Sequence, residues 1–169
     1  YVDMRMHELS EEMIEGWIRH EQSVLDTKLN LENDPRHITG DDPYDILDTI
    51  YGNNELHGGT PGHGTSVAGL VGAIRENGFG INGIADNVEI MVVRIVPGGD
   101  ERDKDVALGI RYAVNQGAKI INCSFGKEFS PEKWMVDEAV RYAEDKGVLI
   151  VHAAGNNASC NDTQGNFPS

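Results

Sequence analysis

The sequence has few basic residues, two cysteines and no long apolar run, and each scarcity excludes a class of protein. Lysine and arginine number 14 against 28 aspartates and glutamates, without a basic stripe. Nucleic-acid binding is therefore excluded, because it needs clustered positive charge. Two cysteines cannot form a four-thiolate metal site. No apolar run reaches the roughly 20 residues that span a bilayer, and no basic-then-apolar leader opens the chain, so we expect a soluble domain with no membrane span.

The two cysteines and the acidic charge are otherwise uninformative about function. Cys123 ends an apolar run and is expected to be a small buried side chain, whereas Cys160 lies in a polar segment. We expect two thiols, and a disulfide between them stays open. The negative charge is concentrated in residues 1–60, which hold 14 acidic and 4 basic residues. Such an acidic surface mainly gives solubility.

Residues 1–56 form an acidic segment ahead of the rest of the domain. Apolar residues recur at helical spacing over residues 7–27, which predicts one long amphipathic helix. Ser10 is an alternative start, because serine is a preferred N-cap. From Asn30 to Gly62 the periodicity disappears among Asn, Asp, Gly and Pro, which predicts a long ordered loop or an insertion. We divide the chain into an acidic helix with an Asp/Asn/Gly-rich insertion (1–56) and a core domain (57–169).

Residues 88–152 alternate between apolar strands and amphipathic helices. Strands are predicted over 88–96, 119–123 and 148–152, and helices over 103–117 and 130–147. Ser130 is the expected N-cap of the second helix, with Pro131 in its first turn. The inward positions are expected to be Val106, Ile110, Ala113 and Val114 in the first helix and Val136, Ala139, Val140 and Ala143 in the second. Short connections between these elements predict a three-layer α/β domain with a parallel sheet, whose function lies at the carboxyl ends of its strands.

Two motifs place polar side chains suited to acyl transfer. His63 opens the run His63-Gly64-Thr65-Ser66-Val67-Ala68-Gly69, on the first turn of an apolar helix that we expect to be buried. Ala153-Ala154-Gly155-Asn156 follows the strand 148–152 and puts an amide just past its end. Taken singly, such a histidine is usually a cap or a solvated side chain, and such an asparagine a turn residue. Together the motifs indicate acyl-transfer chemistry.

These residues resemble the subtilisin-like serine peptidases, the subtilase or peptidase S8 family. Residues 63–69 match its histidine motif, with Ser66 at the variable position, and residues 153–156 match its oxyanion motif. Between them, Asn122-Cys123-Ser124-Phe125-Gly126 matches the family's strand ending in Asn-x-Ser-x-Gly, and Arg94 is the expected basic residue of the preceding strand. The matches occur in order over residues 57–160, and this combination is specific although each motif alone is weak.

The resemblance implies a role for each matched residue. His63 is the general base and acid, which takes the proton from a serine nucleophile and returns it to the leaving amine. Asn156 donates its side-chain amide to the oxyanion. The implied substrate-binding residues pair with an extended peptide and wall its primary specificity pocket. They are Ser124, Phe125, Gly126, Ala154 and Gly155, with Gly98 and Gly99 on the opposite edge of the cleft.

Two motifs that the family requires are missing. Neither Asp-Ser-Gly nor Asp-Thr-Gly precedes the histidine, and Gly-Thr-Ser-Met-Ala does not follow the asparagine. Asp48 is a partial echo of the aspartate site, with a loop carboxylate or a helix cap as the alternatives. We expect the chain to be the central part of a longer peptidase domain, inactive by itself because its serine is absent. Absent flanking strands would leave sheet edges unpaired, which favours self-association.

Other functions are less well supported. The run from Gly62 to Val67 begins like a dinucleotide fingerprint, but no strand precedes it. His7-Glu8-Leu9-Ser10-Glu11 begins like a zinc-peptidase helix, but Glu11 stands where the second histidine is required. His57 and His63 lack a third metal ligand, and Ser124 lacks the Gly-x-Ser-x-Gly elbow of a nucleophile. A non-catalytic peptide-binding or structural domain on the same fold stays open.

We therefore expect an incomplete three-layer α/β subtilisin-like fold, preceded by an acidic helical insertion. The parent protein is expected to hydrolyse peptide bonds with an Asp/His/Ser triad. The implied partners are peptide or protein substrates, and the implied location is secreted or periplasmic. No cofactor is expected. Subtilases often carry structural calcium, and five aspartates of the loop could supply oxygen ligands. Their spacing does not match a fixed calcium motif, so the alternative is that they are solvated carboxylates. These residues are Asp34, Asp41, Asp42, Asp45 and Asp48.

Overall fold

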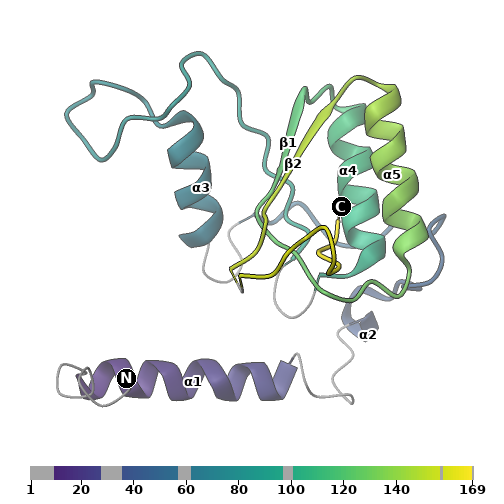
Figure 1. Cartoon of the computed structure of the whole chain (residues 1–169), viewed down its shortest axis with the longest axis horizontal. Helices are drawn as coiled ribbons and strands as arrows, with labels where there is room; N and C mark the ends of the chain where they lie inside the picture. Colours follow the sequence, from purple (N-terminus) through teal and green to yellow (C-terminus); the bar gives the residue numbers. More distant parts are fainter. Residues whose placement is uncertain (1–9, 28–35, 57–61, 97–100, 157, 169) are drawn as a thin grey trace.

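The computed structural model describes residues 10–27, 36–56, 62–96, 101–156 and 158–168 (Figure 1). Its elements are α1 (Glu11–Thr27), α2 (Arg36–Thr39), α3 (Gly62–Gly72), α4 (Asp103–Asn115), β1 (Ile120–Cys123), α5 (Lys133–Asp145) and β2 (Leu149–His152). The residues that lie outside these ranges include His7, Asp34, His57, Gly98 and Gly99. None of the described helices is both long and apolar enough to cross a membrane.

The sheet consists of β1 and β2, which pair in parallel. Ile120 lies opposite Leu149, and Cys123 lies opposite His152. Helix α5 connects the two strands, as a parallel pair requires a crossover rather than a tight turn. The predicted parallel sheet of an α/β domain is confirmed, in a two-stranded form within the described residues. Because the strands are parallel, the segments that follow them leave the sheet at the same edge.

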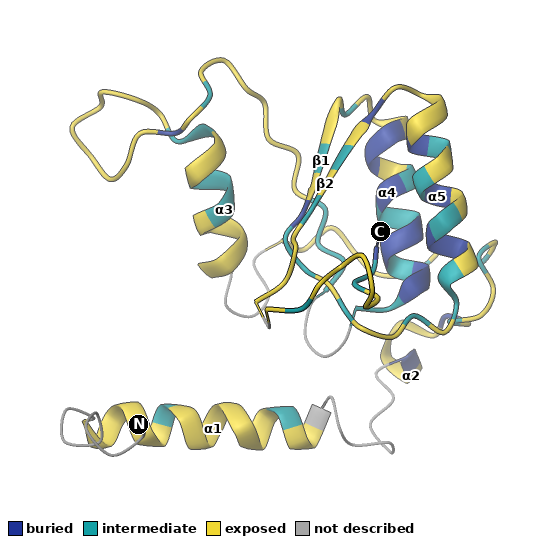
Figure 2. Ribbon diagram, in the orientation of Figure 1, coloured by how far each residue is buried: buried dark blue, intermediate teal, exposed yellow. Residues whose placement is uncertain are grey.

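Helices α4 and α5 pack against each other and form the core of the domain. Figure 2 shows that the buried residues are concentrated on these two helices. Seven of the eight predicted inward positions are buried, and Val140 is half-buried but packs against the same cluster. Ala107, Ala139 and Ala143 are completely inaccessible, so these small side chains allow the helices to approach closely. The 3.6-residue periodicity therefore identified this core correctly.

Helix α1 begins one residue after Ser10, the alternative start that the sequence offered. The backbone N–H of Met13 donates to Ser10 Oγ at 3.2 Å, which is the bond expected of an N-cap serine. The apolar side chains of Trp17, Ile18 and Leu25 are exposed, and Figure 1 draws α1 apart from the α4–α5 unit.

The predicted strand over residues 88–96 is wrong. The described chain runs through this segment without a strand, although Ile95 packs against α4, where a Cβ on Gly109 would lie 2.7 Å from its Cγ2. Ile90, Met91 and Val92 are exposed. A strand needs a hydrogen-bonded neighbour as well as apolar residues, and the sequence pattern reports only the second condition.

Ser130 does not cap α5, so the predicted N-cap is also wrong. The helix begins at Lys133, and Glu132 occupies the N-cap position without a side-chain bond. Ser130 Oγ instead donates to Asp103 Oδ1 at 2.6 Å, while the Glu132 backbone N–H donates to Asp103 Oδ2 at 2.8 Å. A buried carboxylate from the neighbouring helix α4 therefore takes both donors, because charged acceptors form stronger hydrogen bonds than neutral ones.

Ion pairs connect residues 36–51 to the start of α4. Lys104 Nζ lies 3.1 Å from Asp41 Oδ2 and 3.4 Å from Asp48 Oδ2. Arg36 reaches Asp41 at 3.0 Å and Asp105 at 2.7 Å. We call the following residues the charge cluster: Arg36, Asp41, Asp48, Tyr51, Lys104 and Asp105. The cluster shows that residues 36–51 pack on the core, while a domain boundary at residue 56 stays an interpretation.

Candidate functional site

His63 is the second residue of α3, so the expected position on the first turn of a helix is correct. Its side chain is exposed and makes no hydrogen bond or ion pair with another described residue. The expectation that α3 is a buried helix is wrong: Leu70 is 59% exposed and Val71 is 42% exposed, and no residue of the helix is buried. The reason is that α3 is covered mainly at its C-terminal end, where the Gly83 and Ile84 N–H groups donate to Ala73 O and Leu70 O.

The segments that follow β1 and β2 lie beside each other. The Ala153 N–H donates to Cys123 O at 3.1 Å, which extends the pairing one step beyond the strands. Beyond this point the segments 124–126 and 153–156 separate and border a cavity of about 470 Å³. Its lining is Ser124, Phe125, Gly126, Lys127, Glu128, Ala153, Gly155, Asn156, Ser159, Asn161, Gln164, Gly165 and Asn166. The structure thus brings Asn156 together with residues 124–126.

The C-terminal segment 158–168 lines one side of the cavity, and sequence reasoning missed it. Phe167 exchanges two backbone hydrogen bonds with Lys127, at 2.8 and 3.1 Å. Asn161 Nδ2 donates to Ala154 O at 3.1 Å, and Asn166 Nδ2 donates to Ala153 O at 2.8 Å. The available signal was the group of amide side chains after Asn156, which has no periodicity but can satisfy the carbonyls of a loop.

Ser124 has surroundings that suit a wall residue. Its hydroxyl oxygen accepts a hydrogen bond from Asn122 Nδ2 at 2.8 Å. Within the described residues no histidine contacts this hydroxyl, whereas a serine nucleophile needs an adjacent base. His152, the nearest candidate along the chain, places its Nε2 2.8 Å from Phe125 O instead.

Asp48 belongs to the charge cluster and does not contact His63. Its Oδ2 accepts the Asp42 backbone N–H at 2.9 Å and lies 3.4 Å from Lys104 Nζ. The hydrogen bond from Asp42 lowers the pKa of the Asp48 carboxyl. The described partners of Asp48 are thus Asp42 and, on α4, Lys104, and its catalytic role stays a prediction.

The described aspartates of the loop do not fit a calcium ion. Asp41 already accepts hydrogen bonds from Arg36, Lys104 and Thr39, and two neighbouring cations repel a third. Asp42 and Asp45 accept backbone N–H groups two residues ahead, in short turns. No group of three or more His, Cys, Asp or Glu in the described part of the chain is arranged to hold a metal.

The family model and the curated relatives identify the family. The sequence model of the subtilase family matches residues 23–169. The chain is 36% identical over 152 residues to a thermophilic serine proteinase of Bacillus sp. (strain AK1), covering 88% of this chain and 36% of the relative. It is 39% identical over 109 residues to thermitase of Thermoactinomyces vulgaris, covering 64% and 37%. The minor extracellular protease Vpr of Bacillus subtilis (strain 168) is 34% identical over 119 residues, covering 67% and 14%.

The chain therefore spans between 14% and 37% of the lengths of these relatives. No solved structure matches the chain. The family match includes His63, the segments after β1 and β2, and the C-terminal segment that lines the cavity. The chain belongs to the subtilase family.

Proposed function

We propose that the parent protein is a serine endopeptidase, to which this chain contributes the general base His63 and the oxyanion donor Asn156. The observation that carries this proposal is the shared cavity: Asn156 and residues 124–126 line it together at the carboxyl edge of two parallel strands. Polar groups that converge in a cavity at this edge are the usual arrangement of an α/β active site. Family membership supports the same activity.

In this proposal the segment after β1 binds the substrate backbone. An extended peptide pairs with residues 124–126 as an added strand, and its side chain enters the cavity. Ser124, Phe125 and Gly126 all line this wall of the cavity. Backbone hydrogen bonds give affinity independently of sequence, while the cavity lining selects the side chain that precedes the cleaved bond.

Asn156 acts on the charge that develops during the reaction. As a nucleophile attacks the carbonyl carbon, the carbonyl oxygen becomes an oxyanion, and a preoriented amide N–H stabilises it without reorganisation. Removal of one such donor costs about 10²- to 10³-fold in kcat, a magnitude measured in subtilisin, a member of this family. Asn161 and Asn166 bind the carbonyls of Ala154 and Ala153, and so hold the loop that carries Asn156.

His63 moves the proton in this proposal. Its position on the first turn of α3 leaves the ring exposed, so a serine and an aspartate from the rest of the parent can reach it. The 169 residues contain no Gly-Thr-Ser-Met-Ala motif. We therefore propose that this chain alone does not hydrolyse peptides, and Asp48 remains only a candidate for the aspartate.

The test is to express the full-length parent with His63→Ala, Asn156→Ala or the control substitution His20→Ala on α1. We expect His63→Ala to lower kcat/KM about 10⁴-fold or more and Asn156→Ala to lower kcat about 10²- to 10³-fold. His20→Ala should leave both constants unchanged. Equal hydrolysis by wild type and His63→Ala would refute the role of His63.

A second candidate function is a non-catalytic peptide-binding domain. It is favoured by the same cavity, which needs no nucleophile in order to bind an extended peptide. The parent gene distinguishes the two: Asp-Ser-Gly or Asp-Thr-Gly upstream and Gly-Thr-Ser downstream support the enzyme, and substitution of either motif supports the binding domain. Covalent labelling of the parent by a fluorophosphonate, which requires a reactive serine, supports the enzyme, and the absence of labelling supports the binding domain.

We also propose that the parent is exported from the cell. Support comes from the relatives, of which two are named as minor extracellular proteases of Bacillus subtilis. Detection of the parent in the culture medium or the periplasm tests this proposal.

A further inference from the structure

The two walls of the cavity are held by side chains that the motifs do not include. We call residues 124–126 the edge wall and residues 153–156 the oxyanion wall. The edge wall follows β1 and the oxyanion wall follows β2, and the strands stop pairing after Cys123 O accepts the Ala153 N–H. Their relative position therefore depends on contacts made beyond the sheet.

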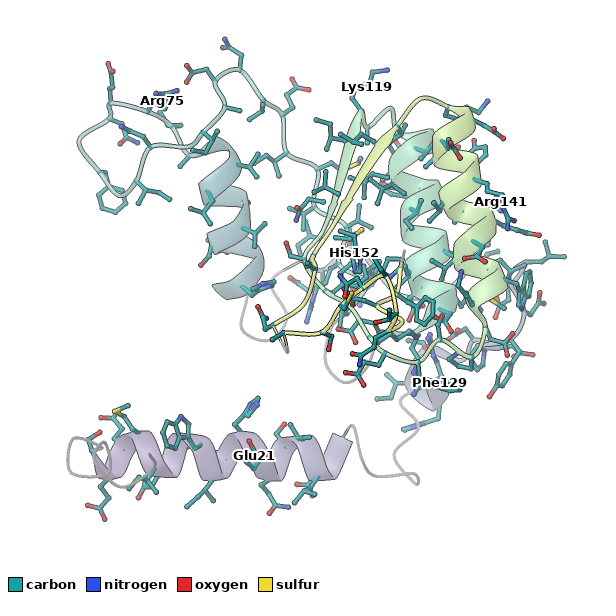
Figure 3. The ribbon with its side chains drawn as sticks, viewed as in Figure 1. Glu21, Arg75, Lys119, Phe129, Arg141 and His152 are labelled. Carbon is teal, nitrogen blue, oxygen red and sulfur yellow. The ribbon has the colours of Figure 1, made fainter. Side chains whose placement is uncertain are left out.

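His152 holds the edge wall. It is the last residue of β2 and is half-buried, and Figure 3 shows it at the end of the sheet that faces the C-terminal segment. Its Nε2 lies 2.8 Å from Phe125 O. Since a carbonyl oxygen only accepts, His152 Nε2 must carry hydrogen and donate it. One strand thus fixes the backbone of the segment that follows its neighbour.

Asn166 holds the oxyanion wall. Its Nδ2 donates to Ala153 O at 2.8 Å, three residues before Asn156. This bond joins the start of the oxyanion wall to the C-terminal segment, which is itself paired to Lys127 through Phe167. Asn166 therefore links the oxyanion wall to the chain that continues from the edge wall.

Both side chains meet at Gly126. A Cβ at this position would lie 2.5 Å from Asn166 Oδ1 and 3.1 Å from His152 Nε2. Real Cβ atoms do not approach other atoms to 2.5 Å, so only glycine leaves room for this arrangement. The contact at Gly126 sets how closely the two holding side chains approach the edge wall.

We propose that His152 and Asn166 are positioning residues with separate effects, His152 on substrate binding and Asn166 on transition-state stabilisation. This inference rests on the proposed endopeptidase function. The edge wall contacts the substrate before and during the reaction, so a shift of this wall changes KM. The oxyanion donor is used only as charge develops, so a shift of its loop changes kcat. Because Gly155 and Asn166 also line the cavity, kinetics and peptide binding are measured with peptides that place glycine before the cleaved bond, so that no substrate side chain enters the cavity.

The experiment compares His152→Leu, His152→Gln and Asn166→Leu in the full-length parent, with peptide anilide substrates. We expect His152→Leu to raise KM about three- to tenfold with kcat within about twofold, the effect of one lost hydrogen bond. His152→Gln keeps an amide donor and should return KM to near the wild-type value. Asn166→Leu should lower kcat about three- to tenfold with little change in KM.

Active-site titration with a fluorophosphonate separates positioning from folding, because it counts only competent enzyme. Asn115→Leu is the matched control: it removes the side-chain hydrogen bond with Tyr142 at the far end of α4 and should change neither constant. If the His152 and Asn166 variants change only the titrated fraction, or both change the same constant, the proposal is overturned.

Failure of the proposed function is recognised separately. If the wild-type parent shows neither turnover nor labelling, the endopeptidase proposal fails, and binding of a short fluorescent peptide then tests the positioning roles. We expect His152→Leu to weaken binding about three- to tenfold, His152→Gln to restore it and Asn166→Leu to leave it unchanged. Equal binding by wild type and His152→Leu, or no binding at all, overturns the inference.

Discussion

Lys104 Nζ lies 3.1 Å from Asp41 Oδ2, and neither side chain is accessible to solvent. The two residues are 63 positions apart in the sequence. Lys104 also donates to Asp42 O at 2.5 Å, while Asp41 accepts from Arg36 and Thr39. Each buried charge therefore has several partners, which offsets the cost of removing it from water. Through this pair, residues ahead of the histidine motif are attached to the helix that forms the core.

Loss of the lysine charge should destabilise the protein strongly. Lys104→Met keeps the length of the side chain but leaves Asp41 with an incomplete set of partners. We expect the free energy of unfolding to fall by about 3 kcal/mol, as when one partner of a buried ion pair is removed. Lys119→Met, an exposed position, is the control and should change it by less than about 0.5 kcal/mol. Urea unfolding at neutral pH measures both, and equal stabilities would contradict the prediction.

Stability should decrease in acid. Burial alone raises the pKa of Asp41, but hydrogen bonds from Thr39 and Lys104 and the charge of Arg36 outweigh it and lower the pKa. Burial also raises the pKa of Asp103, but hydrogen bonds from Lys127, Ser130 and the Glu132 backbone N–H outweigh it, so that this pKa is lowered as well.

The folded protein thus keeps these carboxylates ionised at a pH where the unfolded chain already binds protons. The free energy of unfolding should be constant from about pH 7 to 5 and fall as the pH passes below about 4. Asp103→Asn should reduce this dependence, because the amide does not titrate. Urea unfolding at a series of pH values is the measurement, and a wild type as stable at about pH 3 as at pH 7 would refute the linkage.

The two cysteines should differ in reactivity. Both are thiols, Cys123 buried and Cys160 exposed. Burial raises the pKa of Cys123 to about 11, while a hydrogen bond from the Asp162 backbone N–H lowers the pKa of Cys160. Because the thiolate is the reactive form, an aromatic disulfide reagent should modify one thiol in the folded protein and two in urea. In the folded protein, Cys160→Ser should abolish this modification. If the reagent still modifies the folded variant, the reactive thiol is Cys123 and the prediction is wrong.

Calcium should not stabilise the described loop. Arg36 and Lys104 already bind Asp41, so a further cation there is repelled. We expect the same melting temperature, within about 1 °C, in millimolar calcium and in a chelator, because a ligand stabilises a protein only if it binds the folded state. A rise in melting temperature that saturates with calcium would show a site elsewhere in the chain.

The chain of 169 residues should self-associate. Ile120 and Leu149 remain 63% and 57% exposed on the two-stranded sheet, and unpaired strand edges favour association. Sedimentation velocity at increasing concentration should show growing species. Ile120→Lys places a charge on the strand and should shift the distribution towards the monomer, whereas a concentration-independent monomer in the unsubstituted chain would exclude association.

Local sequence patterns predicted the elements of the core correctly. The inward faces of α4 and α5 repeat every three or four residues, and this spacing persists in the folded protein. The strands β1 and β2 are short apolar runs between these helices, and their parallel pairing followed from the connections. These features depend on residues close together in the sequence, so they can be read without knowledge of distant contacts.

The wrong predictions share a dependence on distant residues. Ser130 has the chemistry of an N-cap, but Asp103, from another helix, provides a stronger acceptor. Residues 88–96 have the apolar character of a strand but no hydrogen-bonded neighbour in the described chain. The residues of α3 are apolar enough for a core, yet little packs on them. In each case burial or pairing requires a partner that the local pattern cannot specify.

The sequence by itself determined the family, the core helices and the motif residues His63 and Asn156, because each is encoded in a short run of side chains. Only the tertiary structure decided that Lys104 and Asp41 are paired, that residues 158–168 line the cavity, and that His152 and Asn166 form hydrogen bonds with the backbone of its walls. The physical reason is the range of the interactions. Periodicity and motifs act over a few residues, whereas hydrogen bonds and ion pairs in a folded chain join groups that sequence distance does not bring together.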